Sequence, residues 1–178
     1  MTRKELIKVV NEARDAGRRP DLCAVDLRGV NLRGVNLENA DLYKANLYGA
    51  DLRGVNLRGA NLVNADMDCA DLSSANLYRA NLSGASLHGA DLSSANLYGA
   101  TLAGADLQNA NLTRAGAQYA ALPCADMYGA NLQGADLSGA NLRGACLGHA
   151  DLRKANLTQA NLSDVVDLES ANLDGCIR

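Results

Sequence analysis

The sequence predicts an all-β fold in which the chain coils around one leucine-filled axis, a parallel β-solenoid with a short N-terminal capping α-helix. Leucine falls on almost every fifth residue from Leu22 to Leu162, in runs such as VNLRG at 30–34 and ADLYK at 40–44. Self-similarity at a short, fixed period indicates a repeat architecture. Residues 1–19 lack this period and carry apolar residues at helical spacing instead.

A period of five fits neither regular element of secondary structure. In a helix, five residues advance about 500°, so the leucines would scatter around its circumference. In a flat strand, side chains alternate between faces, and an odd period would send successive leucines to opposite sides. The chain must therefore turn within each repeat, and successive coils are expected to pair as parallel strands around the leucines.

The other repeat positions suit such a coil. Alanine or valine stands two residues before the leucine, and both are small enough for a second inward position. The residue directly before the leucine is mostly Asp or Asn, whose side chains stabilise turns. Glycine, which readily adopts the positive φ of a tight turn, stands two residues after the leucine in many repeats: Gly29, Gly34, Gly49, Gly54, Gly59, Gly84, Gly89, Gly99, Gly104, Gly129, Gly134, Gly139, Gly144 and Gly175.

Repeats of the form A-(D/N)-L-x-x resemble those of the pentapeptide repeat family, from about Pro20 to Gly175. This resemblance implies a right-handed quadrilateral parallel β-helix with four pentapeptides in each coil. The repeats would then make about seven to eight coils, a rod roughly 35–40 Å long at the ~4.8 Å spacing of paired strands. Many family members have Phe at the central position, whereas this chain contains none.

We expect residues 1–19 to form a capping helix and residues 20–178 to form the repeat array. The segment TRKE at 2–5 is a capping-box pattern, and Gly17 can terminate the helix. An amphipathic helix laid over the first coil would cover its leucines and its unpaired strand edge. The alternative is a membrane-surface or partner-binding helix, because the segment is rich in basic residues: Arg3, Lys4, Lys8, Arg14, Arg18 and Arg19.

The C-terminal end shows no comparable helix. One residue is inserted near Val165–Val166, after which the repeat resumes in a shifted phase at Leu168 and Leu173. An uncapped coil leaves an adhesive edge. We therefore expect a homodimer formed through the C-terminal coils.

Residues 115–125 concentrate the departures from the repeat. Ala117 replaces leucine between Leu97 and Leu137, and a missing leucine would leave a void that costs roughly 2–5 kcal/mol. Drift or a local kink is the favoured interpretation. The alternative is a bulge or short loop that shapes a binding surface.

The sequence argues against an enzyme, a cofactor or a metal site. The two histidines, His88 and His149, take outward positions in distant coils, whereas a nucleophilic site needs them convergent in a pocket. The five cysteines lack metal-ligand spacing, which favours reduced thiols in a cytoplasmic protein. No stretch approaches the ~18–20 apolar residues of a membrane span, and no signal peptide is recognisable.

The net charge is only −3, but the charge is unevenly distributed. Positions twenty apart should stack, so that Asp51, Asp71 and Asp91 share one column. A second acidic column is expected beside it, and the candidate partner-binding acidic face consists of Asp66, Asp68, Asp71, Asp91, Asp106 and Asp126. Rows of carboxylates on a narrow rod could imitate DNA phosphates. The favoured interpretation is that these aspartates are turn residues of the repeat.

Tyr78 and Tyr98 fall in one column on adjacent coils and are expected to stack. With Arg79 nearby, nucleic-acid stacking is one interpretation. The weak overall basicity favours a solvent-exposed aromatic ladder. We therefore expect no direct nucleic-acid binding.

Together these features predict a non-catalytic structural or protein-interaction protein whose partner the sequence does not name. The alternative follows from the resemblance, because some pentapeptide repeat proteins resemble B-form DNA, bind DNA gyrase and confer quinolone resistance. That resemblance implies an inhibitor or protector of a DNA-binding enzyme such as DNA gyrase. Those proteins are usually far more acidic than this chain.

Overall fold

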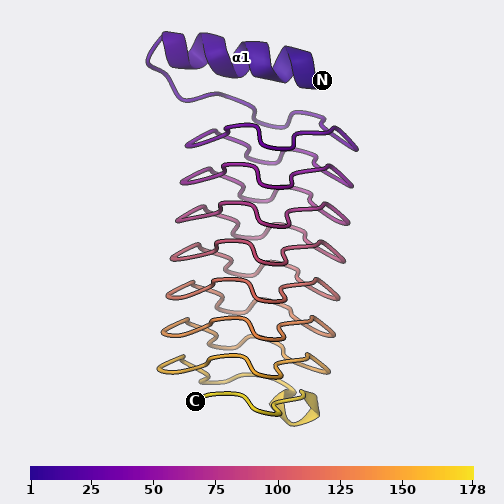
Figure 1. The fold of residues 1–178 in the computed structure, drawn as a ribbon, viewed down its shortest axis with the longest axis vertical. Coiled ribbons are helices and arrows are strands. Elements are labelled where there is room, and N and C mark those ends of the chain that lie inside the picture. Colours follow the sequence, from indigo (N-terminus) through magenta and orange to yellow (C-terminus); the bar gives the residue numbers. More distant parts are fainter.

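The computed structural model describes residues 1–178 and shows a right-handed quadrilateral parallel β-helix (Figure 1). Coils of the chain stack along one axis, with helix α1, Arg3–Asp15, lying across the N-terminal end. The 3-10 helix η1, Leu168–Ser170, lies at the opposite end. Each side of a coil contributes a single parallel β-bridge rather than an extended strand. The predicted fold class is confirmed.

Each pentapeptide folds as a β-turn that begins at its leucine. The leucine carbonyl accepts a hydrogen bond from the amide three residues on, as between Val35 N and Leu32 O at 2.9 Å. The residue two after the leucine has a positive φ, 61° at Gly49 and 56° at Asn39. The prediction for glycine is confirmed, and the same conformation is imposed on arginine, lysine, tyrosine and cysteine at this corner.

The register between coils is twenty residues. Asp51 bridges Asp71, and Asp71 bridges Asp91. On this side, Leu52 N donates to Asp71 O at 2.7 Å, and Asp71 N donates to Ala50 O at 3.0 Å. The same bonds recur on all four sides, so every coil inside the rod is bonded to the coil before it and to the coil after it, and only the two end coils lack one of these neighbours.

The core is a column of leucines surrounded by the small residues that precede them. It contains 55 buried residues in one contiguous cluster, and no polar or charged residue is buried. Burial of a leucine such as Leu72 stabilises the rod by roughly 1.5–3 kcal/mol. Since each coil contacts only its neighbours, these contributions add along the axis.

Helix α1 has defined caps at both ends. The Thr2 side chain accepts a hydrogen bond from Glu5 N at 3.3 Å, and the Glu5 carboxylate accepts one from Thr2 N at 2.7 Å. At the other end, Gly17 has a φ of 65° and Arg18 N donates to Ala13 O at 2.8 Å. This left-handed glycine is the usual way to end a helix and turn the chain. The capping box and the terminating glycine are both confirmed.

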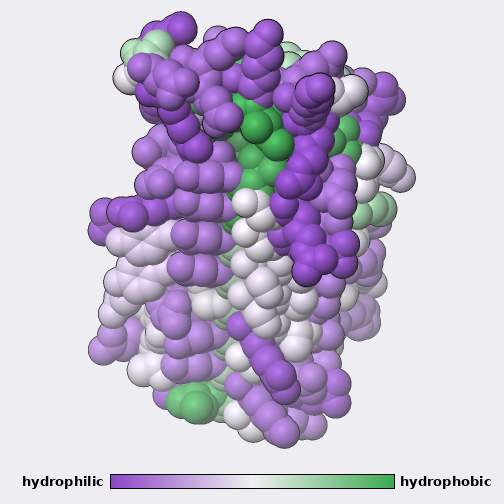
Figure 2. Space-filling view, turned by 45° about the horizontal axis from the view of Figure 1, so that its top comes forward, coloured by the Kyte–Doolittle hydropathy of each residue, from purple (hydrophilic) through white to green (hydrophobic).

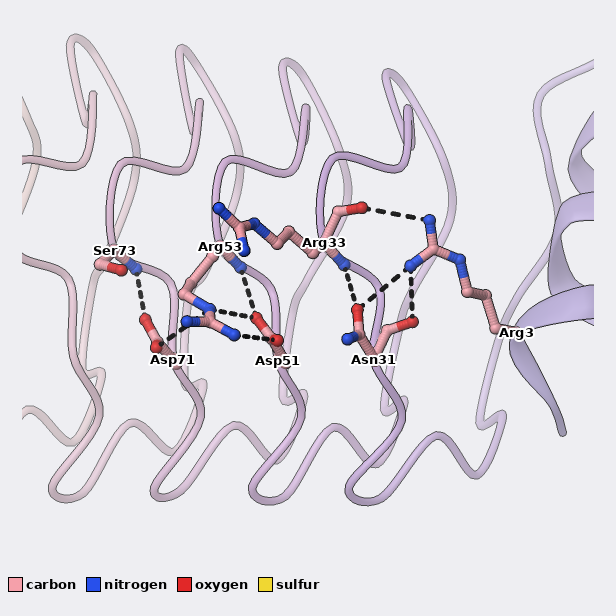
Figure 3. Close-up of polar contacts among 7 residues, drawn as sticks. All are labelled: Arg3, Asn31, Arg33, Asp51, Arg53, Asp71 and Ser73. Atoms are coloured by element: carbon pink, nitrogen blue, oxygen red, sulfur yellow. Dashed lines mark hydrogen bonds and ion pairs between the residues drawn. The ribbon is translucent and has the colours of Figure 1, made fainter.

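Helix α1 seals the first coil in two ways. Leu6 and Val10 are buried and join the core. The Arg3 guanidinium donates to Asn31 O at 3.2 Å, to Asn31 Oδ1 at 3.1 Å and to Arg33 O at 3.2 Å (Figure 3). In later coils the equivalent carbonyls accept an amide from the preceding coil, so Arg3 replaces a missing ladder partner. The face of the rod seen in Figure 2 is mainly hydrophilic, with a group of hydrophobic atoms close to the capped end.

Residues 115–125 follow the regular ladder. Drift of the repeat sequence is therefore confirmed, and the kink, bulge or loop is wrong. Gly116 bridges both Asn96 and Asp136. The side chain of Ala117 points inward and is 2% exposed. Backbone bonds on all four sides hold the coil in place, and therefore a small residue alters only the filling of the core. The departures from the repeat are substitutions in an undisturbed backbone.

The inserted residue near the C-terminus lies after Val166, slightly later than the repeat pattern indicated. Val166 keeps the twenty-residue register with the preceding coil, whereas Asn172 bridges Asp151, which is 21 residues earlier. The extra residue is accommodated by Asp167, with a φ of 57°, and by η1. Stacking therefore resumes on the last two sides in a shifted phase.

Candidate interaction surfaces

Every repeat presents three side chains outward, the residue before the leucine and the two after it. Because the register is twenty, these side chains form columns parallel to the rod axis. The structure places Asp51, Asp71 and Asp91 in one column, as expected. Asp66, Asp106 and Asp126 lie in the column of the neighbouring side, with Ser86 between the first two of them.

The aspartates of the acidic face are half-buried and curl back onto the backbone. The carboxylate of Asp91 accepts a hydrogen bond from Ser93 N at 2.8 Å, and the carboxylate of Asp66 accepts one from Asp68 N at 3.2 Å. The amides of Asn residues in other repeats are used in the same way, as between Arg33 N and Asn31 Oδ1 at 3.0 Å. The interpretation as turn residues is confirmed for the aspartates that directly precede the central residue of a repeat. Asp68 follows that residue instead, and its carboxylate accepts a hydrogen bond from His88 N of the next coil at 2.9 Å.

Only one aspartate of the acidic face has a cationic partner within 4 Å. Arg53 Nε lies 3.6 Å from Asp71 Oδ2. The others accept from neutral donors: Asn111 Nδ2 donates to Asp91, and Gln108 Nε2 donates to Asp126 at 2.8 Å. The acidic face therefore retains most of its negative charge, although its oxygens are partly occupied.

Arginines pair with three aspartates outside the acidic face. Arg53 donates to both carboxylate oxygens of Asp51, at 2.8 and 2.6 Å (Figure 3). These hydrogen bonds lower the pKa of Asp51 to about 2. The same pairing within a repeat recurs in two further places, Asp26 with Arg28 and Asp151 with Arg153.

A different surface lies on the side that carries the column of Asn36, Asn56, Asn76 and Asn96. The rings of Tyr78 and Tyr98 stack with centroids 5.6 Å apart and planes at 10°. The predicted stacking is confirmed. Tyr119 continues the row edge-on, 5.5 Å from Tyr98. The sequence pattern missed Tyr119 because it occupies the next position of the repeat, 21 rather than 20 residues from Tyr98.

A family model described as pentapeptide repeats matches the chain in eight copies, which together span residues 21–177. The chain belongs to the pentapeptide repeat family.

Several solved structures resemble this pentapeptide repeat protein. QnrB1, described as a plasmid-mediated fluoroquinolone resistance protein, is 19% identical with a TM-score of 0.62, over 88% of this chain and 83% of its own. HetL of the cyanobacterium Nostoc sp. strain PCC 7120, described as involved in heterocyst differentiation regulation, is 30% identical with a TM-score of 0.33, over 99% and 96% of the two chains.

A pentapeptide repeat protein of the Arabidopsis thaliana thylakoid lumen is 33% identical with a TM-score of 0.38, over 62% of this chain and 70% of its own. No curated protein sequence matches the chain. The likeness to QnrB1 shows a shared fold. Proteins of the pentapeptide repeat family are generally non-catalytic structural or interaction proteins.

The remaining polar groups of this pentapeptide repeat protein are dispersed. His88 and His149 are both exposed, and His149 packs edge-on against Tyr128 with ring centroids 5.2 Å apart. No group of three His, Cys, Asp or Glu side chains is arranged to hold a metal ion. The single α-helix, of 13 residues, falls short of a membrane span.

Proposed function

We propose that the chain is a non-catalytic rod that binds a protein partner through its lateral faces. The observation that supports this proposal most is the division of the molecule into an entirely apolar core and outward columns of polar side chains. The backbone ladder holds those columns at fixed spacing. A surface that is rigid before binding loses little conformational entropy when a partner docks, and this raises affinity for a flat, complementary surface.

The test is capture of a partner from an extract of the native host, followed by binding measurements with the purified partner. A pentapeptide repeat rod of unrelated surface sequence is the matched control bait. We expect a protein that binds this rod at micromolar concentration and is not retained by the control. Retention of the same proteins by both rods would contradict the proposal.

The second candidate is imitation of DNA toward a DNA-binding enzyme such as DNA gyrase. The supporting observation is the alignment of carboxylates in columns on two adjoining sides, most of them without a cationic partner. Between Ala60 and Arg143 seven aspartates stand against three arginines, a net of four negative charges. Over about four coils, or ~20 Å, this is about one charge per 5 Å, against one per ~1.7 Å in duplex DNA. The low density makes this the second candidate.

A DNA supercoiling assay with purified gyrase tests this candidate. If the rod acts as a DNA analogue, it alters supercoiling at micromolar concentration, and added salt weakens the effect steeply. A variant with Asp66, Asp71, Asp91, Asp106 and Asp126 all changed to Asn should lose the effect. It should keep the fold, because Asn occupies the equivalent turn position in many repeats. An unaltered supercoiling rate with the native rod removes gyrase as a target.

We also propose that two copies associate through their C-terminal coils. Val166 is 49% exposed and Ile177 is 58% exposed at an end that lacks an α-helix like α1 and carries only the three-residue η1. Light scattering should give the mass of a dimer at micromolar concentration, and Val166→Asp with Ile177→Asp should give a monomer. Tyr48→Asp, at a position 51% exposed on a lateral side, is the control that should remain dimeric. A monomeric mass for the native chain excludes the dimer.

We place the protein in the cytoplasm. All five cysteines are free, and three of them are exposed, namely Cys23, Cys69 and Cys124. Exposed thiols suit a reducing compartment. Fractionation of host cells with an antibody to the chain tests this location, and recovery from an oxidising compartment would exclude it.

A further inference from the structure

Half of the six tyrosines gather on one edge of the rod, flanked by two arginines. We define the aromatic column as Arg58, Tyr78, Arg79, Tyr98 and Tyr119. The guanidinium carbons of Arg58 and Arg79 lie 5.3 and 5.1 Å from the centroid of the Tyr78 ring. The row of Arg58 and the three tyrosines therefore extends over four successive coils.

The Tyr119 end of the aromatic column packs against the next coil. The ring of Tyr119 lies over Gly139, where an added Cβ would come within 2.7 Å of two ring carbons. Tyr119 belongs to residues 115–125, the segment with the most irregular repeats, and it remains 61% exposed. The irregular segment thus contributes an ordered aromatic side chain to this surface rather than a loop.

The adjoining asparagine column leaves hydrogen-bond donors without partners. Asn76 Oδ1 accepts from Tyr78 N at 3.2 Å and from Asn96 Nδ2 at 3.3 Å, which uses both of its lone pairs. Asn76 Nδ2 donates once, to Asn56 Oδ1 at 3.3 Å. Asn96 Nδ2 also donates only once. An amide nitrogen carries two hydrogens, so Asn76 and Asn96 each retain one free hydrogen.

These donors surround a shallow depression. A depression of about 240 Å³ is lined by Arg58, Asn76, Tyr78 and Asn96. Its walls offer a guanidinium, two amide N–H groups and a phenol, while the amide oxygens are largely occupied. A carboxylate complements several donors and one positive charge.

The cations here are poorly compensated. The carboxylate nearest to Arg58 is that of Glu38, with Arg58 Nε and Glu38 Oε1 3.9 Å apart and the two side chains 58% and 36% exposed. Such an exposed pair contributes little. Arg79 is exposed and has no carboxylate within 4 Å. The aromatic column therefore carries a local positive charge on an otherwise acidic rod.

We propose that the aromatic column is the docking site for an acidic segment of a protein partner. A carboxylate of that segment binds in the depression beside Arg58, and its apolar side chains pack on the edges of Tyr98 and Tyr119. Tyrosine and arginine are the residue types enriched where binding energy concentrates in protein interfaces. This inference rests on the proposed protein-binding function and assigns that function a surface and a partner chemistry.

The ring geometry favours a protein segment over single-stranded nucleic acid. Base stacking needs an accessible ring face, and insertion of a base between two rings needs roughly 7 Å, two 3.4 Å stacking steps. Tyr78 and Tyr98 are only 5.6 Å apart and nearly parallel. Their facing sides are therefore occupied by each other, and their edges and hydroxyl groups are left for a partner.

The test uses the full chain and three fluorescein-labelled probes in an anisotropy titration. The probes are a short peptide of alternating glutamate and leucine, the same peptide with glutamine for glutamate, and oligouridylate. The test variant is Arg58→Gln with Arg79→Gln. Both changes suit the fold, because glutamine occupies the same two columns at Gln118 and Gln159, the latter with a φ of 59°.

The control variant is Arg33→Gln with Arg114→Gln, which removes the same charge from exposed positions on another side. We expect the acidic peptide to bind, the glutamine peptide to bind at least about tenfold more weakly, and the test variant to lose about tenfold in affinity. The control variant should keep the native affinity. Tyr98→Ala should also weaken binding of the acidic peptide. Melting curves of each variant show whether it is folded.

Three results would overturn the inference: no binding of the acidic peptide up to about 1 mM, equal losses in the test and control variants, or tighter binding of oligouridylate than of the peptide. A different conclusion follows if the rod captures a host protein that the test variant binds equally well. That result leaves the proposed function in place and removes the aromatic column as its docking site.

Discussion

Ala117→Leu tests whether the leucine column has a vacant level. Ala117 lies between Leu97 and Leu137 on one side of the coil, in unbroken register with both. Its side chain is 2% exposed and points into the core. A leucine at this position would therefore enter the apolar core without any change in the backbone bonds at 115–118.

The magnitude follows from the surroundings of this position. Replacing a buried leucine by alanine costs about 2–5 kcal/mol, and the reverse change recovers only the part that the neighbours have not already filled. None of the cavities in the molecule is lined by Ala117. We therefore expect a gain in the free energy of unfolding that does not exceed the lower limit of this range, about 1–2 kcal/mol. This corresponds to a rise in Tm of roughly 2–8 °C for a chain of this size.

Urea unfolding followed by circular dichroism, together with calorimetry, measures this change. Leu97→Ala in the same column is the matched variant and should lose about 2–5 kcal/mol. A lower Tm for Ala117→Leu would refute the reasoning, because it would mean that neighbouring leucines already fill the level and that the added side chain overpacks the core.

Three further perturbations test the corner, the ion pairs and the cap. Gly139→Ala should lower the Tm of the rod more than Gly54→Ala does. Both changes place an alanine in the left-handed conformation, at a cost of about 1–2 kcal/mol. Only at Gly139 would the added Cβ also lie 2.7 Å from a tyrosine ring. Equal losses would mean that the ring moves aside freely. Hydrogen bonds from Arg53 lower the folded-state pKa of Asp51 to about 2, below its ordinary 3.8. The stability that this ion pair adds is therefore present above about pH 4 and is lost as the pH falls toward 2. Asp51→Asn should flatten the plot of Tm against pH in this range. An unchanged slope in the variant would contradict the pairing. Arg3→Gln should cost about 0.5–1.5 kcal/mol and speed amide hydrogen exchange in the first coils only, whereas uniform acceleration along the rod would show that this cap acts globally.

The repeat period and the local chemistry of the chain were enough to predict most of the architecture. A spacing of five excludes a single helical face and a flat sheet, and hence a turning chain with inward leucines follows from geometry. The turn role of Asp, Asn and glycine follows from their individual preferences. The helix at the N-terminus was predictable because its capping box and terminating Gly17 act locally.

The period of five is compatible with a coil of any number of sides, and the family resemblance supplied the value of four. With four sides, the register of twenty aligned the acidic columns and the pair Tyr78 and Tyr98 correctly. Tyr119 was not predicted as part of this row, because a spacing of twenty residues identifies only side chains of the same column. Its edge-on packing on Tyr98 joins two neighbouring columns.

The remaining features depend on contacts between coils. Departures from the repeat at 115–125 suggested a distorted backbone, yet ladder bonds to the coils on both sides override the preferences of Gly116 and Ala117. The exact site of the C-terminal insertion was likewise decided by which residues pair with the preceding coil. Local preferences are readable along the chain because they act over a few residues. The surface that a partner would meet is assembled from residues twenty or more apart, and only the stacking of coils brings these together.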